Sequence, residues 1–178
     1  MHLYLMGYRG SGKTTVGKRL ALATGSQWLD SDEMIVERAK MSIKEIFDSS
    51  GEQSFRDLET QVIQQIAEQS PTDSASLVVS LGGGAILRLE NRQALQASGR
   101  CVWLSGSPES LWRRINSDDA SAASRPNLTD HDGYKEVEEV LAARAPIYQE
   151  LADFTVNTDH RSPDEIVEEI LLWAKSAA

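Results

Sequence analysis

The segment from Gly7 to Thr14 restricts the possible folds of this chain more than any other segment. It has the form G-x-x-x-x-G-K-[ST], with the apolar run Leu3–Met6 before it and the predicted helical run Thr15–Leu20 after it. Between a strand and a helix, this pattern predicts a loop whose backbone N–H groups and following helix dipole bind the phosphates of a nucleoside triphosphate. A glycine-rich turn without a ligand is the alternative, and the strand–helix context weighs against it.

The polar side chains of this segment have expected tasks in nucleotide binding. Lys13 would reach the β- and γ-phosphates, and the hydroxyl of Thr14 would bind Mg²⁺. ATP is therefore the expected co-substrate, and Mg²⁺ is the expected cofactor. The residues predicted to bind the nucleotide here are Gly10, Ser11, Gly12, Lys13, Thr14 and Thr15.

Length and charge limit what else the chain does. Its 178 residues suit one domain, which buries roughly two-thirds of its unfolded surface and needs no disulfides. The formal net charge of −9 argues against general nucleic-acid binding, because affinity for a phosphate backbone comes from clustered Lys and Arg. The single cysteine, Cys101, lies in an apolar run and is expected to be buried and inert.

The hydropathy of the chain places no segment in a membrane. No apolar run approaches the roughly 18 residues of a membrane span. The first residues also lack the charged and apolar pattern of a secretory signal. We therefore expect a cytoplasmic protein without membrane contact, and we expect a monomer.

Short apolar runs alternate with helical patterns along the whole chain. Strands are predicted at 3–6, 28–29, 77–81, 101–104 and 154–156. Helices are predicted at 13–23, 33–38, 42–47, 52–69, 90–97, 108–115, 134–151 and 163–174. This alternation predicts a single α/β domain over residues 1–178, with a five-stranded parallel sheet and helices on both faces. Ligands of such sheets lie at the carboxyl ends of the strands, where the phosphate loop also begins.

Two further segments at this edge carry candidate chemistry. Asp30 and Asp32 stand two apart at a strand end, so both carboxylates can share one face. One suits a hydrated Mg²⁺, and the other suits orientation or deprotonation of a substrate hydroxyl. The alternative for Asp32 is a helix cap. Gly82–Gly84 follows a buried strand, and three successive glycines indicate that the backbone approaches a ligand closely.

Three arginines are candidate ligand-binding residues, each with a simpler alternative. Arg56 lies one helical turn from Glu52 and Glu59, so an ion pair within the helix is the alternative. Arg144 has a similar alternative. Arg125 lies in a long irregular segment, where a solvated side chain is the ordinary expectation and where functional loops are also found.

Taken together, these segments resemble the shikimate kinase family in order and spacing along nearly the whole chain. The matching segments are GYRGSGKTT at 7–15, Asp30–Asp32, Gly51–Arg56 with Glu59, Gly82–Gly84, Arg125-Pro126 and Arg144–Tyr148. The resemblance implies a P-loop kinase of the nucleoside-monophosphate-kinase-like fold. It implies transfer of the ATP γ-phosphoryl to the 3-hydroxyl of shikimate, in aromatic amino-acid (chorismate) biosynthesis. It also implies a substrate-binding region at about 31–62 and a mobile lid at about 116–132.

On the substrate side, the resemblance implies a role for five residues. Asp32 would hold the ring hydroxyls and help to deprotonate or orient the attacking one. Arg56 and Arg144 would bind the shikimate carboxylate, which the planar guanidinium suits. Gly83 and Gly84 would offer backbone N–H groups to the substrate.

On the nucleotide side, the resemblance implies further roles. Asp30 would face Mg²⁺ through water. In the substrate region, Glu59 would brace Arg56. Arg125 would close over the transferring phosphoryl group and neutralise its charge. Arg114 would pack near adenine, and Arg161 lies in the segment that resembles the adenine loop of the family.

The chain also departs from the family pattern, and two other functions stay open. The segment between Arg114 and Arg125 is longer than expected, and Asn127 stands where a leucine is more usual. A kinase for another small hydroxy acid, such as gluconate, is the first alternative. A nucleotide-binding module that has lost phosphoryl transfer is the second, although it would have no use for two carboxylate-binding arginines.

Overall fold

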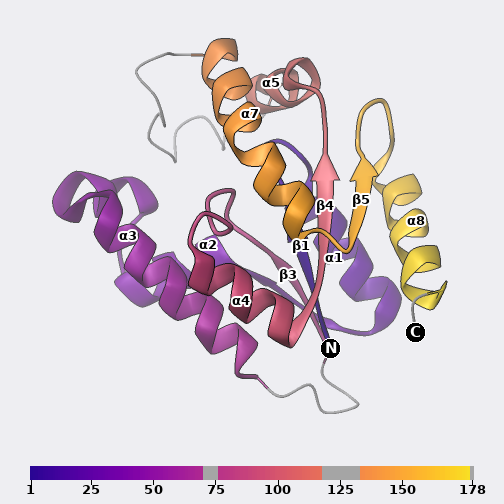
Figure 1. The fold of residues 1–178 in the computed structure, drawn as a ribbon, viewed down its shortest axis with the longest axis horizontal. Coiled ribbons are helices and arrows are strands. Elements are labelled where there is room, and N and C mark those ends of the chain that lie inside the picture. Colours follow the sequence, from indigo (N-terminus) through magenta and orange to yellow (C-terminus); the bar gives the residue numbers. More distant parts are fainter. Residues whose placement is uncertain (70–75, 118–132, 177–178) are drawn as a thin grey trace.

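The computed structural model describes residues 1–69, 76–117 and 133–176, and its centre is a five-stranded parallel sheet (Figure 1). The strands are β1 His2–Met6, β2 Gln27–Asp30, β3 Leu77–Ser80, β4 Gly99–Ser105 and β5 Phe154–Asn157. Their order across the sheet is β2-β3-β1-β4-β5, and every neighbouring pair is parallel. The predicted α/β fold and all five predicted strands are therefore confirmed.

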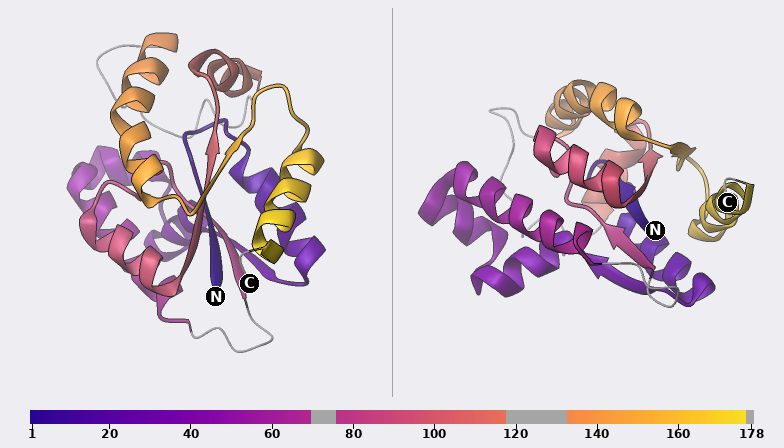
Figure 2. Two further views of the ribbon diagram at one scale, coloured as in Figure 1. Left: turned by 45° about the vertical axis from the view of Figure 1, so that its right-hand side comes forward. Right: turned by 60° about the horizontal axis from the view of Figure 1, so that its bottom comes forward.

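Helices cover both faces of this sheet (Figure 2). They are α1 Lys13–Thr24, α2 Ser31–Ala39, α3 Ile43–Ala67, α4 Leu89–Ser98, α5 Pro108–Ser117, α7 Tyr134–Leu151 and α8 Pro163–Ser176. Apolar residues of α1 and α8 pack on one face, and those of α2, α3, α4 and α7 pack on the other. Because both faces are covered, the strands must be apolar on both sides.

Alternate strand residues supply these two cores. Tyr4 and Val79 belong to the cluster under α2, α3, α4 and α7, whereas Leu5 and Val78 belong to the cluster under α1 and α8. This alternation follows from the two-residue period of a strand. Cys101 lies in the first cluster and is fully buried, and burial raises the pKa of its thiol to about 12. The predicted burial of the thiol is confirmed.

Local sequence patterns set several helix boundaries. Ser42 and Glu45 form the predicted capping box at the start of α3. Gly51 (φ 78°, ψ 171°) breaks the helical backbone inside α3. This break agrees with the prediction of two separate helices, at 42–47 and 52–69. The cap of α2 is not Asp32, which was the alternative for that residue: the side chain of Asp30 accepts a hydrogen bond from the Asp32 N–H at 3.0 Å. The cap of α2 is therefore Asp30, because its extended backbone places that carboxylate at the helix start.

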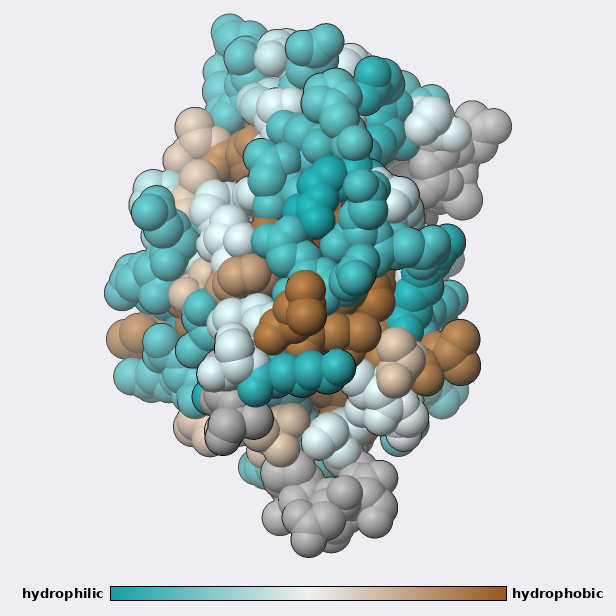
Figure 3. Space-filling view, turned by 90° about the vertical axis from the view of Figure 1, so that its right-hand side faces the viewer, coloured by the Kyte–Doolittle hydropathy of each residue, from teal (hydrophilic) through white to brown (hydrophobic). Residues whose placement is uncertain are grey.

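The surface on the α8 side is mostly hydrophilic, interrupted by apolar side chains (Figure 3). Leu22 of α1 and Leu172 of α8 are among the exposed large apolar residues. Isolated residues of this kind are ordinary on a folded surface. Within the described residues, no helix has the length and apolarity needed to cross a bilayer. The chemistry-bearing residues gather instead at the carboxyl edge of the sheet.

Candidate active site

The predicted phosphate-binding loop joins β1 to α1 and curls around a lysine side chain. Gly10 (φ 78°) and Gly12 (φ 89°) adopt left-handed backbone conformations that favour glycine. The Lys13 ammonium donates hydrogen bonds to the carbonyls of Gly7 (2.9 Å) and Tyr8 (3.0 Å). The lysine is therefore held within the loop and next to the backbone N–H groups at the start of α1.

Two oxygen-bearing side chains lie beside this loop. The Thr14 hydroxyl donates to a carboxylate oxygen of Asp30 at 3.3 Å, which joins the first turn of α1 to the end of β2. Burial raises the pKa of Asp30, and the nearby Asp32 carboxylate raises it further, while Lys13 acts in the opposite direction. Hydroxyl and carboxylate oxygens are the ligands that Mg²⁺ prefers, and this ion commonly takes few protein ligands. The donor set therefore fits Mg²⁺.

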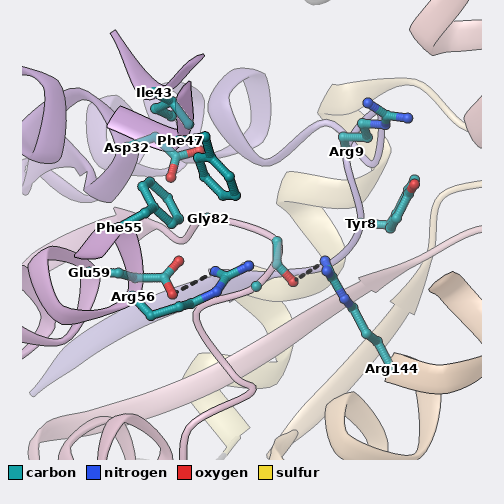
Figure 4. A pocket seen from close by; sticks show the side chains of 12 residues that line it. Tyr8, Arg9, Asp32, Ile43, Phe47, Phe55, Arg56, Glu59, Gly82 and Arg144 are labelled. Carbon is teal, nitrogen blue, oxygen red and sulfur yellow. Dashed lines mark hydrogen bonds and ion pairs between the residues drawn. The ribbon is translucent and has the colours of Figure 1, made fainter. Parts of the chain in front are cut away.

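A pocket opens next to the phosphate loop, between α2, α3, α7 and the turn that follows β3 (Figure 4). The predicted substrate-binding residues all line it, although they come from four separate segments. They are Asp32, Arg56, Gly83, Gly84 and Arg144, with Glu59 beside them. Ile43, Phe47 and Phe55 form an apolar wall. The pocket thus combines the two predicted arginines and a third, Arg9, with carboxylates and an apolar wall.

Arg56 is fixed in the pocket by two carboxylates of its own helix. Its guanidinium binds Glu59 at 2.8 Å and Glu52 at 3.0 Å. Burial alone would lower the pKa of Arg56, but Glu59 and Glu52 together outweigh burial and hold that pKa above its ordinary value. Burial raises the pKa of Glu59, against the effect of Arg56. The ion pairs expected as an alternative are present, and they hold a charged guanidinium in the pocket wall.

The glycine turn after β3 lies between the two arginines (Figure 4). The Gly83 carbonyl accepts a hydrogen bond from Arg144 at 3.0 Å. A Cβ atom at position 84 would lie 2.3 Å from the nearest guanidinium nitrogen of Arg56. Only glycine leaves room for this approach, so Gly84 sets how close the backbone and Arg56 can come.

The carboxylate of Asp32 also lies against this turn. Asp32 is 8% exposed, and a Cβ atom at Gly82 would lie 2.5 Å from one of its carboxylate oxygens. The Gly82 N–H donates to the buried hydroxyl of Ser31 at 2.8 Å. The ends of β2 and β3 are therefore joined where Asp32 enters the pocket.

Two of the arginines predicted on the nucleotide side, Arg114 and Arg161, lie in the described residues, and both are bonded at the segment between β5 and α8. Arg114 donates to the hydroxyl and the carbonyl of Thr158 at 2.9 and 2.5 Å, and to the Gly10 carbonyl at 3.4 Å. It thereby joins the phosphate loop to that segment. Arg161 donates to the Glu165 carbonyl at 3.0 Å and pairs with Glu169 of α8. With a further bond to the Asn157 carbonyl at 3.4 Å, Arg161 joins the end of β5 to α8.

Some predicted residues lie outside the described part of the chain, and some pocket residues were not predicted. Arg125 and nearly all of the predicted lid at 116–132 fall outside the described residues. Tyr8 and Arg9 line the pocket from the variable positions of the phosphate-loop pattern, which specify no side chain. Arg9 pairs with the buried Glu136 of α7 at 2.5 Å. Only the position of Arg9 inside the motif could have drawn attention to it.

Comparisons with known proteins agree on one family. A family model described as shikimate kinase matches residues 9–175. A shikimate kinase of Rhodopirellula baltica is 41% identical over 176 residues, which cover 99% of this chain and 91% of that protein. The structure of a shikimate kinase from Acinetobacter baumannii in complex with shikimate has a TM-score of 0.89 and 32% identity, and the match covers 99% of this chain and 93% of that one.

The comparisons also bear on the gluconate alternative. A gluconokinase from Sinorhizobium meliloti 1021 has a TM-score of 0.54 and 17% identity, with 94% of this chain and 87% of that chain covered. That likeness reflects a shared fold alone. The likeness to shikimate kinase is stronger, because the family model matches residues 9–175 and a named relative is 41% identical over 99% of this chain. The chain therefore belongs to the shikimate kinase family, whose members are ATP-dependent phosphotransferases that act on a hydroxyl of shikimate.

Proposed function

We propose that this chain transfers the γ-phosphoryl group of ATP to the 3-hydroxyl of shikimate through the pocket beside its phosphate loop. The observation that carries the proposal is the convergence of Arg56, Arg144 and Asp32 in one pocket next to Lys13. Arg9 pairs with Glu136, and Arg56 pairs with Glu52 and Glu59. Arg144 instead donates to the uncharged Gly83 carbonyl. The positive charge of Arg144 therefore complements a substrate carboxylate, within a protein whose net charge is −9.

The pocket residues have separate tasks in this proposal. Arg56 and Arg144 bind the substrate carboxylate from two sides, because a guanidinium offers paired N–H donors in one plane. The backbone of Gly83 and Gly84 approaches the substrate between them. Asp32 accepts hydrogen bonds from the ring hydroxyls and orients the attacking one, and it is the candidate acceptor of the hydroxyl proton. Lys13 neutralises charge on the transferring phosphoryl group.

The proposal includes Mg²⁺ held by Thr14 and Asp30. Thr14 would bind the ion directly through its hydroxyl, and Asp30 would hold its water ligands. When bound, the ion neutralises charge on the β- and γ-phosphates. The pair is supported by its position, since both side chains lie beside Lys13 at the carboxyl edge of the sheet.

The remaining assignments complete the proposal. The phosphates would be bound by Gly10, Ser11, Gly12 and Thr15. The adenine would lie near Arg114 and Arg161. Arg125 would close over the phosphoryl group from the lid. We also propose one domain over residues 1–178, with the substrate region at about 31–62 and the lid at about 116–132, acting as a cytoplasmic monomer. The bonds from Arg114 to Gly10 and Thr158 support its place on the nucleotide side.

ADP release by the purified protein tests the proposed function. The assay compares shikimate, gluconate and no acceptor in the presence of ATP and Mg²⁺. We expect strong stimulation by shikimate alone. Stimulation by gluconate would contradict the substrate assignment, and bound ATP without turnover of either acid would favour the non-catalytic module.

The substitution Arg144→Lys is expected to raise the KM for shikimate by about 10- to 100-fold, with a smaller change in kcat. A lysine keeps the charge but loses the paired N–H donors, and charge-assisted hydrogen bonds of this kind contribute about 1.5–3 kcal/mol. Steady-state kinetics at saturating ATP measure the effect. Arg19→Lys is the control, because Arg19 forms a surface pair with Asp164 away from the pocket. An unchanged KM would remove Arg144 from carboxylate binding.

The substitution Gly84→Ala is expected to raise the KM for shikimate by about tenfold, which corresponds to ~1.4 kcal/mol. The added methyl group would lie 2.3 Å from Arg56, so the guanidinium must move. The matched comparison is Gly83→Ala, whose added methyl group meets its nearest atom at 3.6 Å, an ordinary contact distance. The effect at Gly83 should be clearly smaller. Equal effects at both positions would contradict the steric argument.

A further inference from the structure

Tyr148 converges with Arg144 on a single backbone oxygen of the pocket. Tyr148 is fully buried in α7, one helical turn after Arg144. Its hydroxyl donates to the Gly83 carbonyl at 2.7 Å, and Arg144 donates to the same oxygen at 3.0 Å. Its ring stacks on Trp103 of β4, with 5.7 Å between ring centroids and 19° between planes. The hydroxyl is therefore held in one place by packing.

The anchored oxygen belongs to a peptide unit that spans the two arginines. The described chain contains no cis peptide bond, so the Gly83 carbonyl and the Gly84 N–H point in opposite directions. The carbonyl points to α7, and the N–H therefore points away from α7. The Gly84 backbone lies close to the Arg56 guanidinium, since a Cβ atom built at Gly84 would overlap it. Fixing the carbonyl thus fixes the direction of the Gly84 N–H as well.

The two donors differ in what else they can do. A carbonyl oxygen has two lone pairs and can accept both hydrogen bonds. Arg144 carries charge and further N–H groups that a substrate carboxylate can use. The Tyr148 hydroxyl is neutral: burial raises its pKa to about 12, against the charge of Arg144 and a hydrogen bond with it, so the hydroxyl remains a donor at physiological pH. It can hold the Gly83 carbonyl whether or not Arg144 is engaged with a substrate.

We propose that Tyr148 is a positioning residue for shikimate binding: its hydroxyl fixes the Gly83–Gly84 peptide, and through it the Gly84 N–H and the guanidinium of Arg144. This role rests on the proposed function, in which Arg56, Arg144 and the Gly83–Gly84 peptide bind shikimate. Tyr148 itself is not a catalytic residue, since its hydroxyl is bonded to the backbone.

The variant Tyr148→Phe removes only the hydroxyl and keeps the ring that packs on Trp103. We expect the KM for shikimate to rise about tenfold (~1.4 kcal/mol). This is the size expected when a buried acceptor loses one of its donors. The KM for ATP should stay the same, and kcat should change by less than about threefold, because uniform binding is what is lost.

Tyr4→Phe is the matched control. Tyr4 of β1 is also fully buried, its hydroxyl pairs with Ser98 at 2.7 Å, and burial raises its pKa to about 12. It does not line the pocket. Thermal denaturation should show a lowered midpoint for both variants, whereas only Tyr148→Phe should change the KM for shikimate. This comparison separates a positioning role from a general loss of stability.

A double variant tests whether Tyr148 acts through the arginine. In the Arg144→Lys background, Tyr148→Phe should raise the KM by clearly less than it does alone, because coupled residues are not additive. Independent, multiplicative effects would overturn the link to Arg144. An active protein whose Tyr148→Phe variant keeps the wild-type KM, or raises the KM for both substrates equally, would overturn the role alone. A wild type without shikimate-dependent ADP release would overturn the proposed function and this role together.

Discussion

The substitution Lys13→Ala is expected to lower kcat for shikimate phosphorylation by at least about 100-fold. Removal of one preorganised charge or donor at the reacting group costs about 10²- to 10³-fold in comparable cases. In the structure, the Lys13 ammonium is bonded to the Gly7 and Tyr8 carbonyls. The cation is thus held within the loop before nucleotide arrives, and little reorganisation is needed when the γ-phosphate binds. Initial rates at saturating ATP and shikimate measure the loss.

The control for this prediction lies on the same helix. Lys18 is exposed, and its ammonium lies 4.5 Å from the centre of the Trp28 ring. Lys18→Ala removes the same charge from the protein but not from the site, so kcat should be unchanged. Because Lys13 also bonds the loop backbone, Lys13→Arg provides a second comparison and should recover only part of the activity. A Lys13→Ala variant within about threefold of wild-type kcat would contradict the assignment.

Features that depend on a few adjacent residues are predictable from this sequence. The phosphate loop, the capping box of Ser42 with Glu45 and the helix break at Gly51 each follow from local backbone chemistry. The five strands are predictable because both of their faces are buried, which makes them continuously apolar. Their order across the sheet is set by packing between distant segments, and no local pattern encodes it.

The pocket shows the same division between local and distant information. Asp32, Arg56 and Arg144 are identifiable as candidates because charged residues recur at strand ends and on helices in a family-like order. The contacts that define their roles join segments far apart: Gly83 lies 61 residues from Arg144 and 65 from Tyr148. A tyrosine in a helix is ordinarily a packing residue. Its hydroxyl becomes informative only when the acceptor is known.

Asp30 and Asp32 illustrate what sequence spacing leaves open. Asp30 ends β2 and Asp32 lies in the first turn of α2, and the sequence alone offers Asp32 as a helix cap. The backbone decides, because Asp30 is extended (φ −119°, ψ 122°) and its carboxylate accepts the Asp32 N–H. The capping task and the Thr14 contact therefore fall to the same carboxylate. The Asp32 carboxylate is left to face the pocket beside Glu59 and the glycine turn.

The second large effect is expected at Asp32. Asp32→Asn should lower kcat by about 10²- to 10⁴-fold, the range typical of a positioned general acid–base group. Asparagine has nearly the same size and still accepts hydrogen bonds from ring hydroxyls, but it cannot take up a proton. The loss should therefore appear in kcat more than in the KM for shikimate, and ATP binding should persist. Steady-state kinetics with calorimetric ATP titration separate these quantities.

The control variant Asp48→Asn changes the same functional group on the surface of α3. Asp48 forms an exposed ion pair with Lys44, and such pairs contribute little, so activity and stability should stay close to wild type. A loss at Asp32 confined to the KM would assign this carboxylate to binding alone. In that case, transfer would depend on charge neutralisation and orientation without a protein group that accepts the hydroxyl proton, as a loose phosphoryl-transfer transition state permits. The relative size of the changes in kcat and in the KM for shikimate at Asp32 therefore decides between proton transfer and positioning. The carboxylate-binding role of Arg56 and Arg144 stands in either case.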